Sequence, residues 1–526
     1  MSDGGTALVA ALRALDVDVA FGLPGVHNLA AWRAFPGSGV RLVGVRHEQT
    51  AGYAADGYAR ATGRLGVAIT TTGPGAANAV AATGEAWAAH TPLLVIATDI
   101  PSTVRRPGAY RGVLHETTDQ ASFFTPVTKA HYRVTSADEL HQVVVSAGRR
   151  AMQHPRRPVY LEVPTDLLSA PTSARDLPEE LPPPRTAPVP DGLAELLAGA
   201  RRPLLWAGGG ATASGAGEQV GALAERLGAP VLSSYGGRGL LPPDSPSWVP
   251  VPPHEPAAGA LWDQADLVVV LGSDLDAMNT QGFRQPRPPR VVTVDLVEPV
   301  NLPPDVWLQV DVAVGADLLL AAAGPPRERW WTRPERVLGG PEGAFLQALE
   351  AGLPGDAVVV ADMCVAGYWY GGYGRVGRPR GLAYPVGWGT LGFGFPAGLG
   401  ASLSGRPAVA VVGDGGFLFA CGDLATAAQE RLPLTVVLVD DGGYGMLAYD
   451  FTKDGHTPVG CDLEPPDFVA LAQAFRVPAR EVAVADLAQA VADGVATAEP
   501  GLLVVKASYT PPPNTSPRWY RAQQPE

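Results

Sequence analysis

Two acidic side chains follow two apolar runs in the C-terminal third of the sequence. The run "AVAVV" leads into Gly413-Asp414-Gly415-Gly416, and the run "LTVVLV" leads into Asp440-Asp441 and "GGYG". Glycines allow a tight turn and a close approach of an anion to backbone N–H groups, but Asp414 repels an anion. A divalent cation resolves this conflict, because the acid can bind the metal while the metal binds a phosphate.

We expect the metal ligands to be Asp414, Asp441 and the carbonyl of Gly443. Mg²⁺ typically takes a few oxygens from protein and the rest from phosphate and water. A helix predicted over 417–432 should point its N-terminus at the same turn. Taken singly, each acid also fits an ordinary turn, a helix cap or a solvated corner. Two acids 27 residues apart, at adjacent strand ends, indicate a magnesium-bound diphosphate more specifically.

The elements that must position these turns are short buried strands. Runs such as "TPLLVIATD", "ADLVVVLGS" and "LTVVLVDD" alternate with helix-like stretches such as "GEQVGALAERLG" along the whole chain. Continuous Val/Leu/Ile runs between helices are typical of parallel sheets covered on both faces. The predicted fold class is therefore α/β, with three doubly wound parallel-sheet domains. Ligands bind beyond the carboxyl ends of such strands, which is where both acids fall.

Two Pro-rich segments, 170–190 and 322–336, divide the chain. Proline fixes φ and removes a donor, so these segments suit linkers better than regular elements. In chain order, the sequence therefore predicts a first domain at 1–170, a middle domain at 190–322, a third domain at 337–510 and a C-terminal tail at 511–526.

Composition narrows the class of function. The 526 residues are 46% hydrophobic and 17% charged, as in globular proteins. The net charge of −13 argues against a nucleic-acid surface, and no apolar window is long enough for a membrane span. Three scattered cysteines provide neither a disulfide framework nor a zinc site. The N-terminus lacks a basic region typical of a signal peptide, so we expect a cytoplasmic protein with a small-molecule partner, no nucleic acid and no membrane.

A second motif, "VRHEQTAGYAADGYAR" at 45–60, places Glu48 at the start of a predicted helix. Together with Gly-Asp-Gly, it resembles the thiamine-diphosphate enzymes of the acetolactate synthase and pyruvate decarboxylase superfamily. The resemblance covers essentially the whole chain, and implies a pyrimidine-binding domain, a middle domain and a diphosphate-binding domain in that order. The superfamily's usual metal-binding Asn is here Asp441, which keeps the oxygen ligand and adds a charge.

The resemblance implies roles for further residues. Glu48 would hydrogen-bond N1′ of the cofactor's aminopyrimidine and favour the imino tautomer, which removes the C2 proton; otherwise it is a helix-dipole partner. Leu391 would wedge between the two rings and bend the cofactor; otherwise it is ordinary core. The implied cofactor contacts are Gly25, Gly73, Asn78, Gly389, Leu391, Gly413, Asp414, Gly415, Gly416, Asp441, Gly443, Tyr444, Gly445 and Met446.

The implied cofactors are thiamine diphosphate and Mg²⁺, and the implied assembly is symmetric. In this superfamily, the domains that carry Glu48 and the metal face each other across a subunit interface. A homodimer is therefore the expected minimum and a homotetramer the expected assembly. The middle domain's "WAGGGATASG" lacks G-x-G-x-x-G spacing, so we expect no nucleotide there.

The resemblance also implies the reaction. A C2 ylid attacks a 2-oxo acid, CO₂ leaves, and an enamine remains. Protonation releases an aldehyde, whereas attack on a second carbonyl gives an acyloin or acetohydroxy acid. We expect 2-oxo-acid decarboxylation, with an acetolactate synthase-like carboligase as the alternative and a non-catalytic relative as a third hypothesis.

Two histidines favour decarboxylation. The stretch "RGVLHETTDQ" at 111–120 resembles the branch that holds 5-guanidino-2-oxopentanoate decarboxylase, with His115 where acetolactate synthases typically have Gln. His27 lies in the loop "FGLPGVHNL". His27 and His115 are the candidate acid–base groups, although a loop His is often only hydrogen-bonded. The Pro-rich tail at 511–526 is expected to be either an active-site lid or a surface strap.

Overall fold

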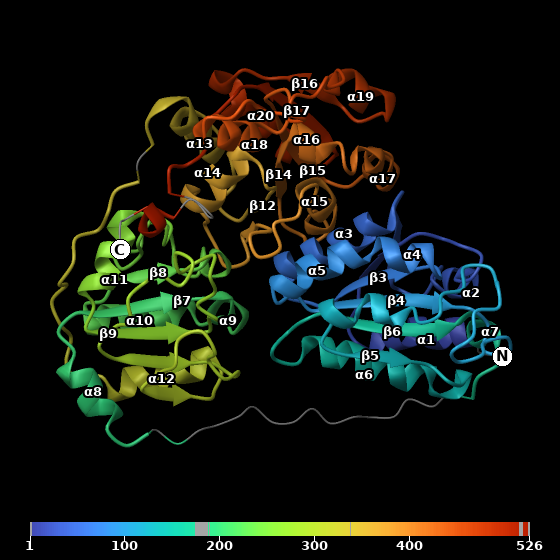
Figure 1. Ribbon diagram of the computed structural model, residues 1–526, viewed down its shortest axis with the longest axis horizontal. Helices are drawn as coiled ribbons and strands as arrows, with labels where there is room; N and C mark the ends of the chain where they lie inside the picture. Colours follow the sequence, from blue (N-terminus) through green and yellow to red (C-terminus); the bar gives the residue numbers. More distant parts are fainter. Residues whose placement is uncertain (1–2, 174–187, 189, 337, 515–518, 524–526) are drawn as a thin grey trace.

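The computed structural model describes residues 3–173, 188, 190–336, 338–514 and 519–523. Three parallel sheets lie in three lobes, blue to cyan, green to yellow, and orange to red along the chain (Figure 1). Helices cover both faces of the sheets, and the strand interiors are buried. The predicted fold class, three doubly wound α/β domains, is confirmed.

The first sheet has the strand order β2-β1-β3-β4-β6-β5, with every neighbouring pair parallel. Its strands are β1 (Val19–Gly22), β2 (Arg41–Gly44), β3 (Gly66–Thr70), β4 (Leu93–Asp99), β5 (His131–Arg133) and β6 (Val159–Pro164). Its helices are α1 (Gly4–Ala14), α2 (Leu29–Ala34), α3 (Glu48–Thr62), α4 (Pro74–Asn78), α5 (Val80–Ala88), η1 (Ala121–Phe123), η2 (Thr125–Val127), η3 (Ala137–Glu139), α6 (Leu140–Met152) and α7 (Thr165–Ser169).

The middle sheet has the order β11-β10-β9-β7-β8 and is also parallel. Its strands are β7 (Pro203–Ala207), β8 (Val231–Ser233), β9 (Leu267–Leu271), β10 (Val291–Val294) and β11 (Val306–Leu308). Its helices are α8 (Leu193–Gly199), α9 (Gly209–Ala213), α10 (Gly217–Leu227), η4 (Tyr235–Gly237), α11 (Pro256–Gln264) and α12 (Val312–Ala322).

The third sheet has the order β13-β12-β14-β15-β17-β16. Its strands are β12 (Val358–Ala361), β13 (Leu382–Ala383), β14 (Ala408–Gly413), β15 (Leu434–Asp440), β16 (Ala479–Glu481) and β17 (Gly501–Lys506). Its helices are α13 (Gly340–Gly352), α14 (Val365–Tyr373), α15 (Gly394–Ala401), α16 (Asp414–Phe417), η5 (Cys421–Asp423), α17 (Leu424–Glu430), α18 (Gly445–Lys453), α19 (Phe468–Ala474), η6 (Val484–Asp486) and α20 (Leu487–Thr497).

The helix predicted over 417–432 is wrong, because α16 ends at Phe417 and α17 begins only at Leu424. The Asp423 carboxylate fixes this break: it accepts from the backbone N–H of Arg46 over 2.8 Å and from the hydroxyl of Thr426 over 2.7 Å. Arg46 belongs to the first domain, so no local pattern reveals the contact. The Gly-Asp-Gly turn is therefore followed by a single helical turn, α16, and not by a long helix.

The first and third domains of the chain pack through α3 and α15, which lie next to each other (Figure 1). Glycines make this close approach possible. A Cβ on Gly57 would stand 2.0 Å from the carbonyl oxygen of Ala397, and one on Gly400 would stand 1.8 Å from that of Ala54. The two backbones therefore touch, and any larger residue at either glycine would push the domains apart.

The tail was predicted to be a lid or a strap. Its described end, η7 (Tyr520–Gln523), lies on the middle domain, where Arg521 donates to Asp263 over 2.7 Å. Residues 515–518 and 524–526 lie outside the described residues. Within the described part of the chain, no helix has the length and apolar character to cross a membrane.

Candidate functional site

The two acidic turns lie side by side at the carboxyl edge of the third sheet. β14 and β15 are parallel neighbours in register, with Gly413 opposite Val439. Asp414 is the first residue of α16, and Asp441 follows the last residue of β15. The adjacency of these two strand ends, expected from the sequence, is confirmed.

The carboxylates of Asp414 and Asp441 face each other in a largely buried position. Asp414 is 1% exposed, and its Oδ2 has no hydrogen-bond partner among the described residues. Burial, followed by the neighbouring Asp441, raises the pKa of Asp414 to about 7. Burial likewise raises the pKa of Asp441. Two acids that disfavour each other's charge are arranged to receive a cation.

The close packing around Asp414 and Asp441 explains why glycines occupy the neighbouring positions 415 and 445. A Cβ on Gly445 would stand 2.2 Å from Asp441 Oδ2, and one on Gly415 would stand 2.6 Å from the ring of Tyr444. The Gly443 carbonyl oxygen is 3.4 Å from that same Gly415 position. Two carboxylates and a carbonyl are hard oxygen donors, so the residues present fit Mg²⁺. Among the described residues, no group of three or more His, Cys, Asp or Glu side chains is placed to hold a metal ion, so this site has two carboxylates only.

Asp362 is a residue of this edge that the motifs did not reveal. It follows β12, is 1% exposed, and lies near Gly416, whose Cβ would stand 3.0 Å from Asp362 Oδ2. Burial raises the pKa of Asp362 to about 6. Hydrogen bonds from the backbone N–H groups of Met363 and of residues 392–394 act in the opposite direction and lower this pKa. Asp362 therefore fixes the turn that carries half-buried Leu391. The only signal in the sequence is an acid after the apolar run "AVVVA".

The first domain carries the other half of the predicted site. Glu48 is the first residue of α3, and His47 caps this helix by accepting from the N–H of Gln49 over 3.2 Å. Glu48 is 6% exposed, and its Oε2 accepts from the side-chain amide of Asn78 over 3.0 Å. Asn78 ends α4, which begins directly after Gly73. Two predicted site residues from separate motifs thus meet.

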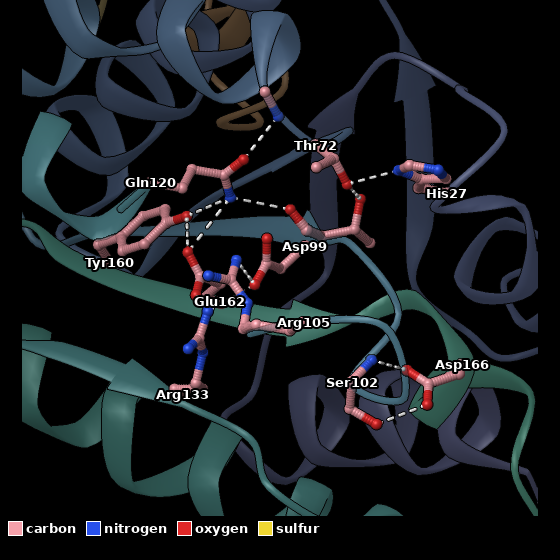
Figure 2. Close-up of polar contacts among 12 residues, drawn as sticks. His27, Thr72, Asp99, Ser102, Arg105, Gln120, Arg133, Tyr160, Glu162 and Asp166 are labelled. Atoms are coloured by element: carbon pink, nitrogen blue, oxygen red, sulfur yellow. Dashed lines mark hydrogen bonds and ion pairs between the residues drawn. The ribbon is translucent and has the colours of Figure 1, made fainter. Parts of the chain in front are cut away.

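The turn at Gly73 is held by Gln120, which sequence reasoning missed. Gly73 has φ +61°, and a Cβ there would stand 2.5 Å from the carbonyl oxygen of His115, so only glycine fits without strain. The Gly73 N–H donates to Gln120 Oε1 over 2.5 Å, and Gln120 Nε2 donates to the Thr98 carbonyl and to the Tyr160 hydroxyl. Figure 2 shows Gln120 at the centre of this buried network. No local feature of "HETTDQ" marks the side chain as buried.

The two predicted histidines also meet. Their ring centroids are 5.2 Å apart in an edge-to-face arrangement, and His27 Nδ1 lies 2.8 Å from the Thr72 hydroxyl. Thr72 in turn contacts Thr98 over 2.9 Å, and Figure 2 shows the His27–Thr72 contact. Burial and the neighbouring His115 lower the pKa of His27. His115 has φ +65°, and its buried Nδ1 has no partner in the described part of the chain.

A network of carboxylates and arginines lies beside the His27–His115 pair. Asp99 contacts Arg105 and Arg133, while Glu162 contacts Arg133 and accepts from the Tyr160 hydroxyl over 3.1 Å. Burial and Asp99 raise the pKa of Glu162. Both acids lie against arginines in this network, which stiffens the structure beside the histidines (Figure 2).

Glu48 and Asp414, the key residues of the two half-sites, are both buried in the single chain. Glu48 contacts Asn78 of its own domain, and one contact with the third domain runs through Tyr53 of the same helix, whose hydroxyl is 2.6 Å from that of Thr390. Exposed apolar side chains flank the predicted site residues on both domains. They are Val26, Leu29, Tyr110 and Leu114 on the first domain, and Trp388, Phe419, Leu447, Phe451 and Val459 on the third.

Family models match the three domains separately. The N-terminal TPP binding domain of thiamine pyrophosphate enzymes matches residues 2–123, and the central domain matches 191–322. The C-terminal TPP binding domain matches residues 363–506. The order agrees with that implied by the motifs.

Curated relatives match over nearly the full length. The chain is 39% identical to the "Probable 2-ketoarginine decarboxylase AruI" of Pseudomonas aeruginosa, over 91% of this chain and 89% of that protein. It is 31% identical to an acetolactate synthase of Mycobacterium bovis, over 90% of this chain and 82% of that protein. It is 27% identical to a "Probable acetolactate synthase large subunit" of Methanocaldococcus jannaschii, over 95% and 91%.

Proposed function

Because this chain belongs to the thiamine pyrophosphate enzymes, as a member similar to 2-ketoarginine decarboxylase and acetolactate synthases, we propose that it decarboxylates a 2-oxo acid non-oxidatively. The observation that carries the proposal is the pair of half-sites: Glu48 held by Asn78, and Asp414 facing Asp441. When bound, thiamine diphosphate would supply a carbon nucleophile that adds to the substrate carbonyl and an electron sink for the pair left when CO₂ departs.

The third domain would bind the cofactor's diphosphate through magnesium. Asp414, Asp441 and the Gly443 carbonyl would hold the cation, and the N–H groups of the Gly413–Gly416 turn would meet the phosphates. The extra charge of Asp441 compensates the cation more fully than an amide would. Asp362 would hold the turn that carries Leu391, the residue expected to contact the cofactor.

Glu48 would hold a proton at N1′ of the aminopyrimidine ring. Its low exposure keeps water from competing for the carboxylate, and Asn78 keeps the side chain in one orientation. Gly73 brings backbone close to the same pocket because it has no Cβ. These residues would bind and orient the ring at the end opposite to the metal.

His27 and His115 would move protons at the substrate carbonyl and at the carbon that loses CO₂. His27 is neutral around pH 7 because its pKa is lowered, so it can accept a proton or a hydrogen bond there. A proton delivered to that carbon ends the reaction as an aldehyde, which favours decarboxylation over ligation. The proposed substrate class includes 5-guanidino-2-oxopentanoate, which is 2-ketoarginine, the compound in the printed name of the Pseudomonas relative.

The alternative is an acetolactate synthase-like carboligase, which the similarity to acetolactate synthases supports. The purified protein with thiamine diphosphate and Mg²⁺ should be given pyruvate and 5-guanidino-2-oxopentanoate in separate reactions. CO₂, aldehyde and acetolactate are then quantified by mass spectrometry. Stoichiometric aldehyde and CO₂ support the proposal, whereas acetolactate as the main product from pyruvate replaces it with the alternative.

We also propose a homodimer as the smallest active unit and a homotetramer as the assembly. The exposed apolar side chains beside both half-sites support this, since solvent-exposed clusters around a site indicate an interface. A second copy would place its Glu48 half-site on the Asp414 half-site of the first.

Coexpression of E48Q and D414N chains tests the dimer. In a mixed dimer, one site carries both lesions and the other carries none, so about a quarter of wild-type activity should return after random pairing. If each site instead forms within one chain, every site carries one lesion and the mixture stays as inactive as the single variants.

A further inference from the structure

A cavity of about 530 Å³ lies between the middle domain, the linker and the third domain. Three chain segments line it. None of the lining residues belongs to either half-site of the proposed catalytic centre. Its principal lining residues are Arg238 and Trp248 from the middle domain, Arg333 and Arg336 from the linker, and Arg375 from the third domain. We call these five residues the arginine cavity. Its volume is in the range of small-molecule sites.

The charges of the arginine cavity are unbalanced. Arg336 pairs with Glu350 through two contacts of 2.6 and 3.0 Å. In the described part of the chain, Arg238, Arg333 and Arg375 have no carboxylate partner, and Glu335 is the acid among the lining residues. Three unpaired guanidinium groups in one cavity create a positive potential that attracts anions.

Arg238 is the buried cation of the group, with 7% of its surface exposed. Its two terminal nitrogens donate to the carbonyls of Gly372 and Gly374, which ties the middle domain to the end of α14. Burial lowers the pKa of Arg238 to about 10, which reflects the cost of holding this charge without a counter-ion. An anion nearby would offset that cost.

Arg333 and Arg375 are placed to touch such an anion. Arg333 is anchored by one nitrogen, which donates to the Pro243 carbonyl over 2.7 Å, so its planar group is held at the cavity wall. The Arg375 guanidinium has no hydrogen-bond partner among the described residues, although its backbone N–H is held by Glu350 over 2.7 Å. A purely structural role explains the carbonyl contacts of Arg238 and Arg333, but these contacts leave the positive charges of the cavity without a counter-ion, and the Arg375 guanidinium has no such contact among the described residues.

We propose that the arginine cavity binds a small organic anion that carries two or more phosphate or carboxylate groups. Guanidinium groups pair with such groups through two parallel hydrogen bonds, and the Trp248 side offers an apolar wall for the rest of the molecule. The ligand contacts all three segments, so its binding stabilises the arrangement of the middle and third domains. This site is independent of the proposed catalytic function.

The experiment uses the full-length protein with saturating thiamine diphosphate and Mg²⁺, which keep the catalytic diphosphate position filled. Inorganic phosphate, ADP and citrate are titrated against sodium chloride of equal ionic strength, with calorimetry and the thermal midpoint as readouts. The test variant is R333Q/R375Q. The matched control, R476Q/R480Q, removes two exposed charges from the same domain as Arg375, outside the cavity.

At least one of the three anions should bind the wild type and the control equally and raise their thermal midpoints. The R333Q/R375Q variant should bind it at least tenfold more weakly, because each lost charge-assisted pair costs about a factor of ten. Phosphate, citrate or ADP as the effective probe identifies a phosphoryl, carboxylate or nucleotide ligand. The single variant R375E, at an exposed side chain, repeats the test if the double variant misfolds. No binding by the wild type, or equal loss in the control, overturns the proposal.

Discussion

The side-chain amide of Asn78 donates to Oε2 of Glu48 over 3.0 Å, which joins the motif at 45–60 to the loop after β3. Asn78 thereby fixes a carboxylate that the proposed mechanism requires in one orientation. We expect N78A to lower kcat at least tenfold with little change in unfolding midpoint, since Asn78 lies at the surface of α4. Steady-state kinetics with N78D as a second variant check this, because a second acid beside Glu48 should be more damaging than alanine. Unchanged kcat in both variants would contradict the positioning role.

Asp441 is the second of the two predicted acidic metal ligands, directly after the last residue of β15. We expect D441N to change the dissociation constant for Mg²⁺ less than tenfold, since an oxygen ligand remains and repulsion with Asp414 falls. D414A should weaken metal-dependent binding of thiamine diphosphate by on the order of 100-fold or more, because it removes a ligand outright. Tryptophan fluorescence quenching on cofactor addition measures both. Equal effects of the two variants would contradict the expectation that an amide oxygen can replace the carboxylate of Asp441.

The His27–His115 pair should decide how the reaction ends. We expect H115Q to lower aldehyde release on the order of 100-fold, the usual contribution of a general acid, and to raise the share of acetolactate formed from pyruvate. The control is T72V, which removes the His27 contact of 2.8 Å without replacing either histidine. Product ratios are read by mass spectrometry. A lower rate with an unchanged product ratio would assign His115 to substrate binding and not to proton delivery.

Gln120 holds the Gly73 turn from behind. We expect Q120L to lower the thermal midpoint by several degrees, because the Gly73 N–H would be left buried without an acceptor. It should also lower kcat more than it weakens cofactor binding. The comparison variant is Q142L on α6 of the same domain, where the amide makes only a 3.4 Å contact with Ser146. Indistinguishable behaviour of the two variants would remove Gln120 from the site.

His254 should make stability depend on pH. Burial lowers its pKa to about 4, whereas the unfolded chain protonates near the ordinary 6.5. The unfolded chain therefore binds the proton first, so the stabilising contribution is present above pH 6.5 and is lost as the pH falls toward 4. The loss amounts to about 3 kcal/mol. H254Q should flatten the fall in thermal midpoint between pH 7 and pH 4.5, while H131Q, at an exposed histidine, should follow the wild type.

The sequence predicts those parts of the molecule that depend on local pattern. Buried apolar runs predicted three parallel sheets, and glycines around Asp414 and Asp441 predicted two turns that do meet. Contacts between distant segments could not be predicted in this way. The break before α17 depends on Asp423 reaching Arg46, and the Gly73 turn depends on Gln120, a residue that looks like any exposed glutamine in the sequence. The domain limits at 170–190 and 322–336 and the assignment of individual site residues stay predictions.

In the proposed dimer, Glu48 from one copy of the chain activates a cofactor anchored by Asp414 and Asp441 of another. The most direct test is hydrogen–deuterium exchange at C2 of bound thiamine diphosphate, followed by quenched-flow NMR in wild type and E48Q without any substrate. We predict that E48Q binds the cofactor with Mg²⁺ but exchanges the C2 proton at least 100-fold more slowly than wild type. An exchange rate equal to that of the wild type, with the cofactor fully bound, would contradict the account.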